Sequence, residues 1–185
     1  MRIRKRLSRA QNLIEFVVVI PILILILFGI IELALFWKTI NNVQEIALEA
    51  AAGAAAQYVP DDAASNAGAD KAINIVQNRV KSLEIEKITF TEQATDPMYG
   101  TKPFTLYEYD SVSKATLADG SQVPLIKLIV DYRDPYKNGV ITQLIYQYRT
   151  VLLGMEFSMP GGSKVVIIPR DIEVSSTKIQ QYKNY

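Results

Sequence analysis

The stretch that decides the fold is LIEFVVVIPILILILFGIIELALFW, residues 13–37. Its 25 residues include only two charges, Glu15 and Glu32. A helix of this length is about 37 Å long, whereas the hydrocarbon core of a bilayer is about 30 Å thick. The run therefore predicts one transmembrane helix, and Trp37 followed by Lys38 marks its far interface.

The residues before this run are strongly basic. Five cations and no acidic residue stand there: Arg2, Arg4, Lys5, Arg6 and Arg9. Because positive charge is retained on the cytoplasmic side, we expect a cytoplasmic N-terminus, a single pass through the inner membrane and an extracytoplasmic head. A cleaved secretory signal is disfavoured, since its apolar region has only about 7–15 residues. Membrane lipid is therefore the first expected partner.

The composition limits what the head can do. The chain has 185 residues and a net charge of +1, but beyond the basic leader 15 basic residues stand against 19 acidic ones. A mildly acidic remainder argues against nucleic acid as a partner. The chain has no Cys and no His, which excludes zinc–thiolate sites, Cys nucleophiles and Ser-His-Asp triads. We expect no enzyme, no metal site and no cofactor.

Glu15 is the unusual residue of the span. A carboxylate within hydrocarbon costs at least about 2.5–3.5 kcal/mol, so an acid there is by default a functional-site hypothesis. It stands five residues after a small residue, Ala10, which closes the basic leader. Alternatively, Glu15 simply reaches the lipid headgroups, because it lies close to the membrane boundary.

The order of these residues resembles the N-terminal region of TadE-like proteins, the minor pseudopilins of Tad (Flp) type IV pilus systems. The resembling string is RLSRAQNLIEFVVVIPILILILFGIIELALFWKTINNVQEIALEAAAGAAA, residues 6–56. The resemblance implies that a prepilin peptidase cleaves between Ala10 and Gln11, although Gly is the usual residue before the cut. Glu15 and Phe16 would then be the fifth and sixth residues of the mature protein.

The resemblance also implies a role for Glu15 in assembly. After cleavage Gln11 carries a free ammonium group, and stacked subunits place this amine near Glu15 of a neighbour. Pairing the two charges offsets part of their desolvation cost and fixes the axial register of the subunits. The implied function is that of a minor pilin-like structural subunit, in or at the tip of a pilus. Its implied partners are other pilin subunits, the pilus assembly machinery and the prepilin peptidase. The alternative is a permanently anchored extracytoplasmic adaptor or binding module.

The helix is expected to continue beyond the membrane. Small or apolar residues recur there with heptad spacing, and they form a packing seam of Phe36, Ile40, Val43, Ala47, Ala50 and Ala54. The seam predicts one helix over about residues 11–57, and it serves either a second helix or the head itself. Pro60 is expected to end this helix, and Asp61 or Asp62 to cap the next. The apolar face of that second helix is Ala69, Ile73, Val76, Val80 and Leu83.

Beyond residue 84 the pattern changes to strands separated by Gly, Pro and Asp turns. Strands are expected at 84–92, 104–110, 123–133, 164–168 and 171–179, with 123–133 central and covered by a helix. The segment 141–153 fits both periods, and we favour a helix there. The many tyrosines suit either a contact surface or ordinary strands. The predicted organisation is a leader at 1–10, a transmembrane and spine helix at 11–58, and a head at 59–185. The class is α+β, with a second helix and a small antiparallel sheet in the head.

Overall fold

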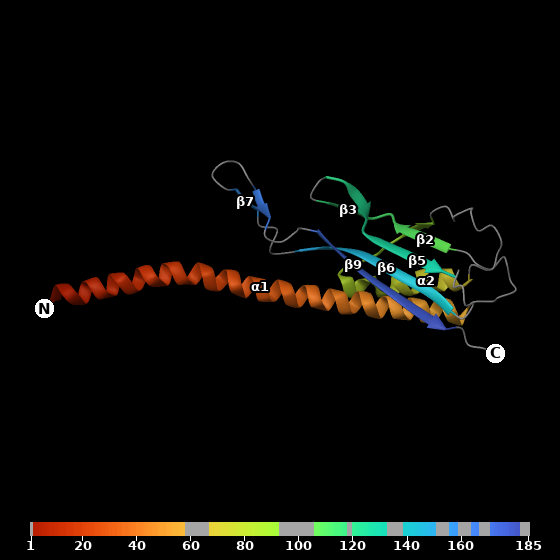
Figure 1. Ribbon diagram of the computed structural model, residues 1–185, viewed down its shortest axis with the longest axis horizontal. Helices are drawn as coiled ribbons and strands as arrows, with labels where there is room; N and C mark the ends of the chain where they lie inside the picture. The colour runs from red at the N-terminus through yellow and green to blue at the C-terminus, as the bar shows by residue number, and fades with distance from the viewer. Residues whose placement is uncertain are drawn as a thin grey trace. The chain divides into compact units, whose positions relative to one another are not determined.

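The structure, a computed structural model, describes residues 2–57, 67–92, 106–117, 120–132, 139–150, 156–158, 164–166 and 171–181. Within these residues the helices are α1 (Arg2–Ala56) and α2 (Ala67–Arg79), followed by the 3₁₀ turn η1 (Val80–Leu83) (Figure 1). The strands are β1 (Phe90–Glu92), β2 (Leu106–Ser111), β3 (Lys114–Thr116), β4 (Gln122–Pro124), β5 (Ile126–Asp131), β6 (Gly139–Arg149), β7 (Glu156–Ser158), β8 (Lys164–Val166) and β9 (Asp171–Gln181).

The chain divides into two compact units. The helix unit comprises Met1–Phe36 and Thr150–Pro169, and the sheet unit comprises Trp37–Arg149 and Arg170–Tyr185. Helix α1 contributes to both units. A long apolar N-terminal helix, a second short helix and an antiparallel sheet make this an α+β fold, so the predicted class is confirmed.

Helix α1 is a continuous helix of 55 residues. Leu, Ile and Ala dominate its sequence. Leu and Ala are good helix formers because they lose little or no side-chain freedom in a helix, whereas β-branched Ile is a weaker one. The helix continues through Pro21, which membranes tolerate because neighbouring groups satisfy the freed backbone. The predicted long helix is therefore confirmed, and its backbone is already helical at Arg2. The predicted break at Pro60 and the caps at Asp61 or Asp62 lie outside the described residues.

Helix α2 and η1 bury the face that the sequence predicts. Ala69, Val76, Val80 and Leu83 are buried, and Ile73 is half-buried. The helical path ends at Glu84, which adopts a left-handed conformation with φ of 63°. Its N–H bonds to the carbonyl of Lys81 at 3.1 Å, so a turn replaces the start of the strand predicted at 84–92. Only its last three residues, in β1, are extended and paired.

The main sheet has five antiparallel strands in the order β1-β2-β5-β6-β9. The central strand is β5, as predicted for 123–133, and α2 packs against it. Its buried face is Ile126, Leu128 and Val130, with Tyr132 just beyond the strand. The predicted strand is interrupted, however, because 122–124 pairs with β3 in a separate ladder. Residues 104–105, 133 and 167–168 of the predicted strands lie outside the described residues.

The helix favoured for 141–153 is wrong. Residues 139–149 form β6, an 11-residue strand that pairs with β5 on one side and β9 on the other. Val140, Thr142, Leu144, Tyr146 and Tyr148 face the core, while the residues between them are less buried. The sequence misled because Ile141 and Ile145 also lie on the outer face, so apolar residues satisfy a helical period as well. Two neighbouring strands settle the choice, because only an extended β6 pairs with both.

The tyrosines of the sheet are core residues. Tyr107, Tyr109, Tyr132, Tyr146 and Tyr148 are all buried. The rings of Tyr107 and Tyr132 meet edge to face with centroids 5.9 Å apart, and those of Tyr107 and Tyr109 stack at 6.3 Å. Such aromatic pairs add to the free energy of area burial. Of the two readings of these tyrosines, the structure supports core residues at these five positions, four of them within strands and Tyr132 just beyond β5.

Burial makes the sheet sensitive to alkali. Desolvation raises the pKa of Tyr109 and Tyr146 above the ordinary 10.0, and nearby acids, chiefly Glu92 for Tyr109 and Glu84 for Tyr146, raise it further. The unfolded chain loses these protons near pH 10 while the fold retains them. Their contribution to stability is therefore complete below pH 10 and is lost progressively as the pH rises above 10 towards the raised pKa of the folded state.

We expect the fold to melt cooperatively as the pH rises above about 10. Near-UV circular dichroism of the detergent-solubilised chain measures the midpoint. Tyr109→Phe removes one of the two titrating groups, so its midpoint should move to higher pH. An unchanged midpoint in both Tyr109→Phe and Tyr146→Phe would contradict this account.

Candidate functional site

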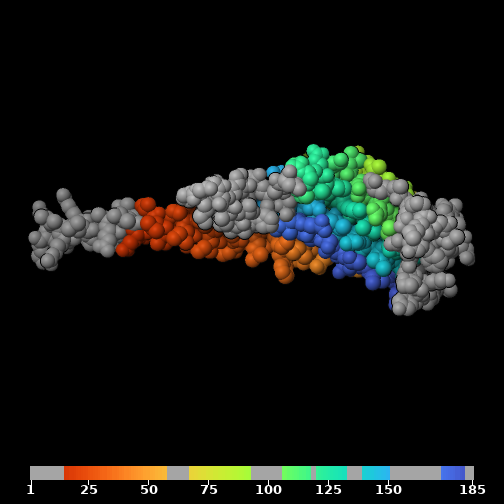
Figure 2. Space-filling view, turned by 45° about the horizontal axis from the view of Figure 1, so that its top comes forward, coloured from red at the N-terminus to blue at the C-terminus, as the bar shows by residue number. Residues whose placement is uncertain are grey.

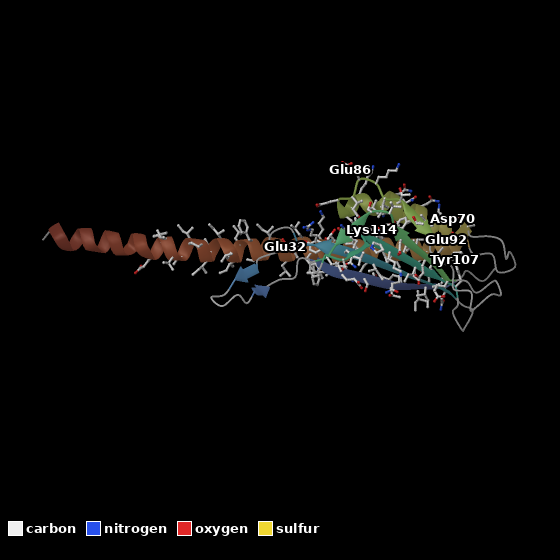
Figure 3. All side chains as sticks on the ribbon, turned by 90° about the horizontal axis from the view of Figure 1, so that it is seen from above. Glu32, Asp70, Glu86, Glu92, Tyr107 and Lys114 are labelled. Carbon is white, nitrogen blue, oxygen red and sulfur yellow. The ribbon has the colours of Figure 1, made fainter. Side chains whose placement is uncertain are left out.

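The part of α1 that lies in the helix unit exposes a long apolar surface. Its large apolar side chains from Phe16 to Ile31 are between 38% and 67% exposed. Figure 2 shows atoms of this part of α1, in red, at the molecular surface, and Figure 3 shows side chains projecting along it. Soluble proteins rarely expose an apolar surface of this extent. Among the described residues, α1 over Glu15–Ala56 is the one helix long and apolar enough to cross a membrane. The helix is thus compatible with single-pass membrane anchoring.

Glu15 and Phe16 lie at the start of this apolar surface. Both side chains are exposed on α1. Ala10 and Gln11 belong to the same helix, and Gln11 precedes Glu15 by about one turn, or about 6 Å along the axis. The described side chains begin at Glu15. No described acidic side chain lies between Glu15 and Glu32 on this helix, so Glu15 is well separated from the other acid of the span.

The predicted packing seam is largely buried within the chain. Val43, Ala47, Ala50 and Ala54 have no exposed surface, while Phe36 and Ile40 are half-buried. The contact between the two helices is close because small residues line it. A Cβ added to Gly68 of α2 would lie 2.7 Å from the carbonyl oxygen of Ala54. From Val43 to Ala54, the seam is therefore the face of α1 on which the sheet unit folds.

Polar contacts fix α1 and α2 beside this seam. Arg79 donates from Nε to Glu49 Oε2 at 2.7 Å, forms a second ion pair with the same carboxylate, and approaches Glu45 at 3.5 Å. Asn42 Nδ2 donates to the carbonyl of Ser82 at 2.7 Å. The sequence suggests only that Glu45 and Glu49 share a helical face. Their partner, Arg79, lies 30 residues beyond Glu49 and could not be assigned.

The Arg79 contact changes the acidity of Glu49. The hydrogen bond from Arg79 lowers the pKa of the Glu49 carboxyl, desolvation opposes the change, and the positive charge of Arg79 lowers the pKa further. The stabilisation from this pair is therefore present at neutral pH and is lost as the pH falls below the ordinary value of 4.5. Because both side chains are substantially exposed, the contact serves orientation more than stability.

The described residues contain no group of three or more Asp or Glu side chains placed to hold a metal ion. Asp61 and Asp62, the adjacent acidic pair that precedes α2, lie outside the described residues. The features that stand out are consequently those of a long apolar helix, compatible with single-pass membrane anchoring, and of the sheet unit that folds on its continuation. They point to an anchoring and packing role for α1.

Comparison with known proteins supports this interpretation. The family model described as "TadE-like protein" matches residues 12–56, which lie within α1. No curated protein and no solved structure matches the chain. The matched range contains Glu15, Phe16 and the whole packing seam, and begins just after Gln11. The match shows that residues 12–56, about a quarter of the chain, are similar to TadE-like proteins, as the sequence resemblance predicted.

Proposed function

We propose that this chain is a minor pilin-like structural subunit that is inserted with its N-terminus in the cytoplasm and assembled into, or at the tip of, a Tad-type pilus. The observation that carries the proposal is the coincidence of the TadE-like match with a helix whose apolar residues from Phe16 to Ile31 are exposed. Before assembly this surface is covered by lipid, and in a filament it is covered by the same surface of neighbouring subunits.

Processing after Ala10 is the first step of the proposed mechanism. A prepilin peptidase would remove residues 1–10 and leave the α-amine of Gln11 at the membrane face. Glu15 then supplies the opposite charge for the amine of a neighbouring subunit. A pair of opposite charges in a bundle of low dielectric constant is far less costly than either charge alone, so it favours a single axial register.

The seam has a different task in this mechanism. Since Val43, Ala47, Ala50 and Ala54 are buried against the rest of the sheet unit, they hold the head on the helix. Contacts between subunits are then left to the exposed apolar surface that precedes the seam. The head, residues 59–185, supplies the remaining partner contacts.

The proposal is tested with Glu15→Gln in cells that carry the pilus machinery. We expect incorporation into pilus fractions to fall about tenfold or more, because a buried amine without its counter-ion costs at least about 1.4 kcal/mol. Quantitative immunoblotting of sheared pili measures it. Glu86→Gln removes an exposed acid of the sheet unit and should assemble normally.

N-terminal sequencing of the membrane-extracted wild type and Glu15→Gln completes the test. Both chains should begin at Gln11. An intact leader in the wild type would favour the permanently anchored adaptor, which needs no cut. If Glu15→Gln were incorporated as well as the wild type, the proposed pairing of Glu15 would be contradicted, even with a cleaved leader.

A further inference from the structure

Strand β9 forms one edge of the five-stranded sheet along its whole length. All 11 of its residues pair with β6 in an unbroken register, whereas β1, the strand at the opposite edge, has three residues. No strand among the described residues pairs with the other side of β9. Figure 2 shows atoms of β9, in blue, at the molecular surface. The edge that β9 presents is therefore long and, within the described part of the chain, open.

The backbone groups at this edge can be assigned from one hydrogen bond. The N–H of Gln147 on β6 donates to the carbonyl of Leu125 at 3.0 Å, so Gln147 turns its backbone groups toward β5. In an antiparallel ladder, successive residues turn their N–H and C=O groups to opposite sides of the strand. Tyr146 therefore turns its groups toward β9, and its register partner Val174 turns back toward β6. The odd-numbered residues of β9 consequently turn their backbone groups toward the open edge.

The same residues also expose their side chains. Within the strand they are Glu173, Ser175, Thr177 and Ile179, all exposed, whereas Val174 and Ser176 between them are buried. Each residue of this exposed set offers one N–H and one C=O, and the set spans about 20 Å. An unpaired row of this kind is a template for another strand.

Strand β9 has none of the usual features that block an edge. Proline, a bulge or a protruding lysine commonly prevents pairing at the edge of a sheet. The sequence of β9, DIEVSSTKIQQ, contains no Pro, and its unbroken register leaves no bulge. Its one cation, Lys178, is even-numbered and belongs to the set whose backbone groups face β6. The open edge is therefore suited to strand addition, a common mode of peptide recognition.

The exposed side chains define the chemistry of an added strand. At one end Ile179, which is 67% exposed, stands opposite half-buried Ile141 of β6, so an apolar residue beside Ile179 would extend an apolar row across the sheet. At the other end Glu173 accepts a hydrogen bond at Oε2 from Gln147 Nε2 at 3.2 Å. A basic residue opposite Glu173 would pair with this carboxylate. The two hydroxyl residues between them suit threonine on the added strand.

We propose that the open edge of β9 binds an extended segment of a partner polypeptide as a sixth strand, antiparallel to β9, with an apolar residue opposite Ile179 and a basic residue opposite Glu173. Every ladder of the sheet is antiparallel, and antiparallel pairs are the more stable. The main-chain hydrogen bonds supply affinity, and the two end residues set the direction of the segment. This binding does not depend on cleavage after Ala10 or on the pairing of Glu15, so its failure would leave the proposed function intact.

Two heptapeptides with blocked ends test the proposal. Val-Gln-Thr-Gln-Thr-Gln-Lys places Val opposite Ile179 and Lys opposite Glu173 when it runs antiparallel to β9. The reversed sequence, Lys-Gln-Thr-Gln-Thr-Gln-Val, has the same composition but makes these two pairs only in a parallel strand. Fluorescence polarisation of the labelled peptides with the detergent-solubilised full-length chain measures Kd. We expect the first peptide to bind at least about threefold more tightly, since two cross-strand pairs distinguish them. Tighter binding of the reversed peptide would overturn the antiparallel arrangement.

A proline variant tests the edge itself. Thr177→Pro removes an N–H that faces the open edge but leaves the hydrogen bonds to β6 in place, and edge strands tolerate Pro at such positions. Thr177→Val keeps the N–H and is the matched control. We expect Thr177→Pro to weaken binding of the first peptide at least about tenfold, and Thr177→Val to change it by less than about threefold. Far-UV circular dichroism checks that both variants retain the sheet. Equal binding to the wild type and Thr177→Pro would overturn the proposal.

Amide hydrogen exchange locates the bound strand. In the free chain the amides of Ser175 and Thr177 should exchange at least about tenfold faster than those of Val174 and Ser176, and the first peptide should slow them. Protection of Ser175 and Thr177 in the dilute free chain would mean that the edge is already covered, which contradicts the proposal. Protection that appears only as the chain is concentrated, without peptide, would assign the edge to a second copy of this chain and would likewise overturn it.

Discussion

Leu128→Ala is expected to lower the free energy of unfolding of the sheet unit by about 3 kcal/mol, within the usual range of about 2–5 kcal/mol for such truncations. Leu128 has no exposed surface and lies in β5, the central strand. Its register neighbours are Tyr109 on β2 and Leu144 on β6, both buried. Paired strands on both sides limit collapse of the cavity, so the loss should exceed the transfer term alone.

Chemical denaturation of the detergent-solubilised chain, followed by near-UV circular dichroism of the tyrosines, measures this loss. Ile129→Ala is the matched control, because the next residue of β5 lies on the opposite, half-buried face. Ile129→Ala should lower the free energy of unfolding by only about 1 kcal/mol. If both substitutions destabilised equally, the inner face of β5 would not be the centre of the core.

Gly68→Ala is expected to destabilise the sheet unit by about 1–3 kcal/mol, even though Ala favours a helix over Gly by about 1 kcal/mol. A Cβ at Gly68 would lie 2.7 Å from the backbone oxygen of Ala54 and closer still to the hydroxyl of Tyr132. A backbone oxygen on a packed helix cannot move aside as a flexible side chain does. The strain therefore falls on the junction of α1, α2 and the end of β5.

Gly29→Ala provides the control in the same protein. Gly29 also lies within a helix, α1, but an added Cβ there meets no other atom within 4 Å. Thermal unfolding in detergent should leave Gly29→Ala unchanged and lower the midpoint of Gly68→Ala by several degrees. A Gly68→Ala protein as stable as the wild type would mean that α2 moves away from Ala54 at little cost.

Both helices and the strands β1, β2, β5, β8 and β9 were predictable from local pattern, whereas β3, β6 and β7 were not. In β5 the buried residues Ile126, Leu128 and Val130 alternate with less buried ones, and this two-residue period identifies a strand. The strand β6 has apolar residues on both faces, and its state depends on β5 and β9, which lie far away in the sequence. At Glu84 the left-handed turn after η1 overrides the local preference for a strand.

The features of the candidate site also differ in whether local sequence could predict them. The basic leader, Ala10, Glu15 and the apolar run are consecutive, so their order alone indicated a TadE-like segment, and the family match over 12–56 confirmed it. The partner of Glu49, Arg79, lies 30 residues away in the sequence. This pairing could not be predicted from spacing.

What the sequence by itself determined is the long apolar N-terminal helix and its resemblance to TadE-like proteins, because hydrophobic length and residue order are local properties. Only the tertiary structure decided that the seam from Val43 to Ala54 is buried beneath the head, and that residues 139–149 form a strand. These outcomes depend on which surfaces bury one another, and burial is a property of the packed chain and not of any single segment.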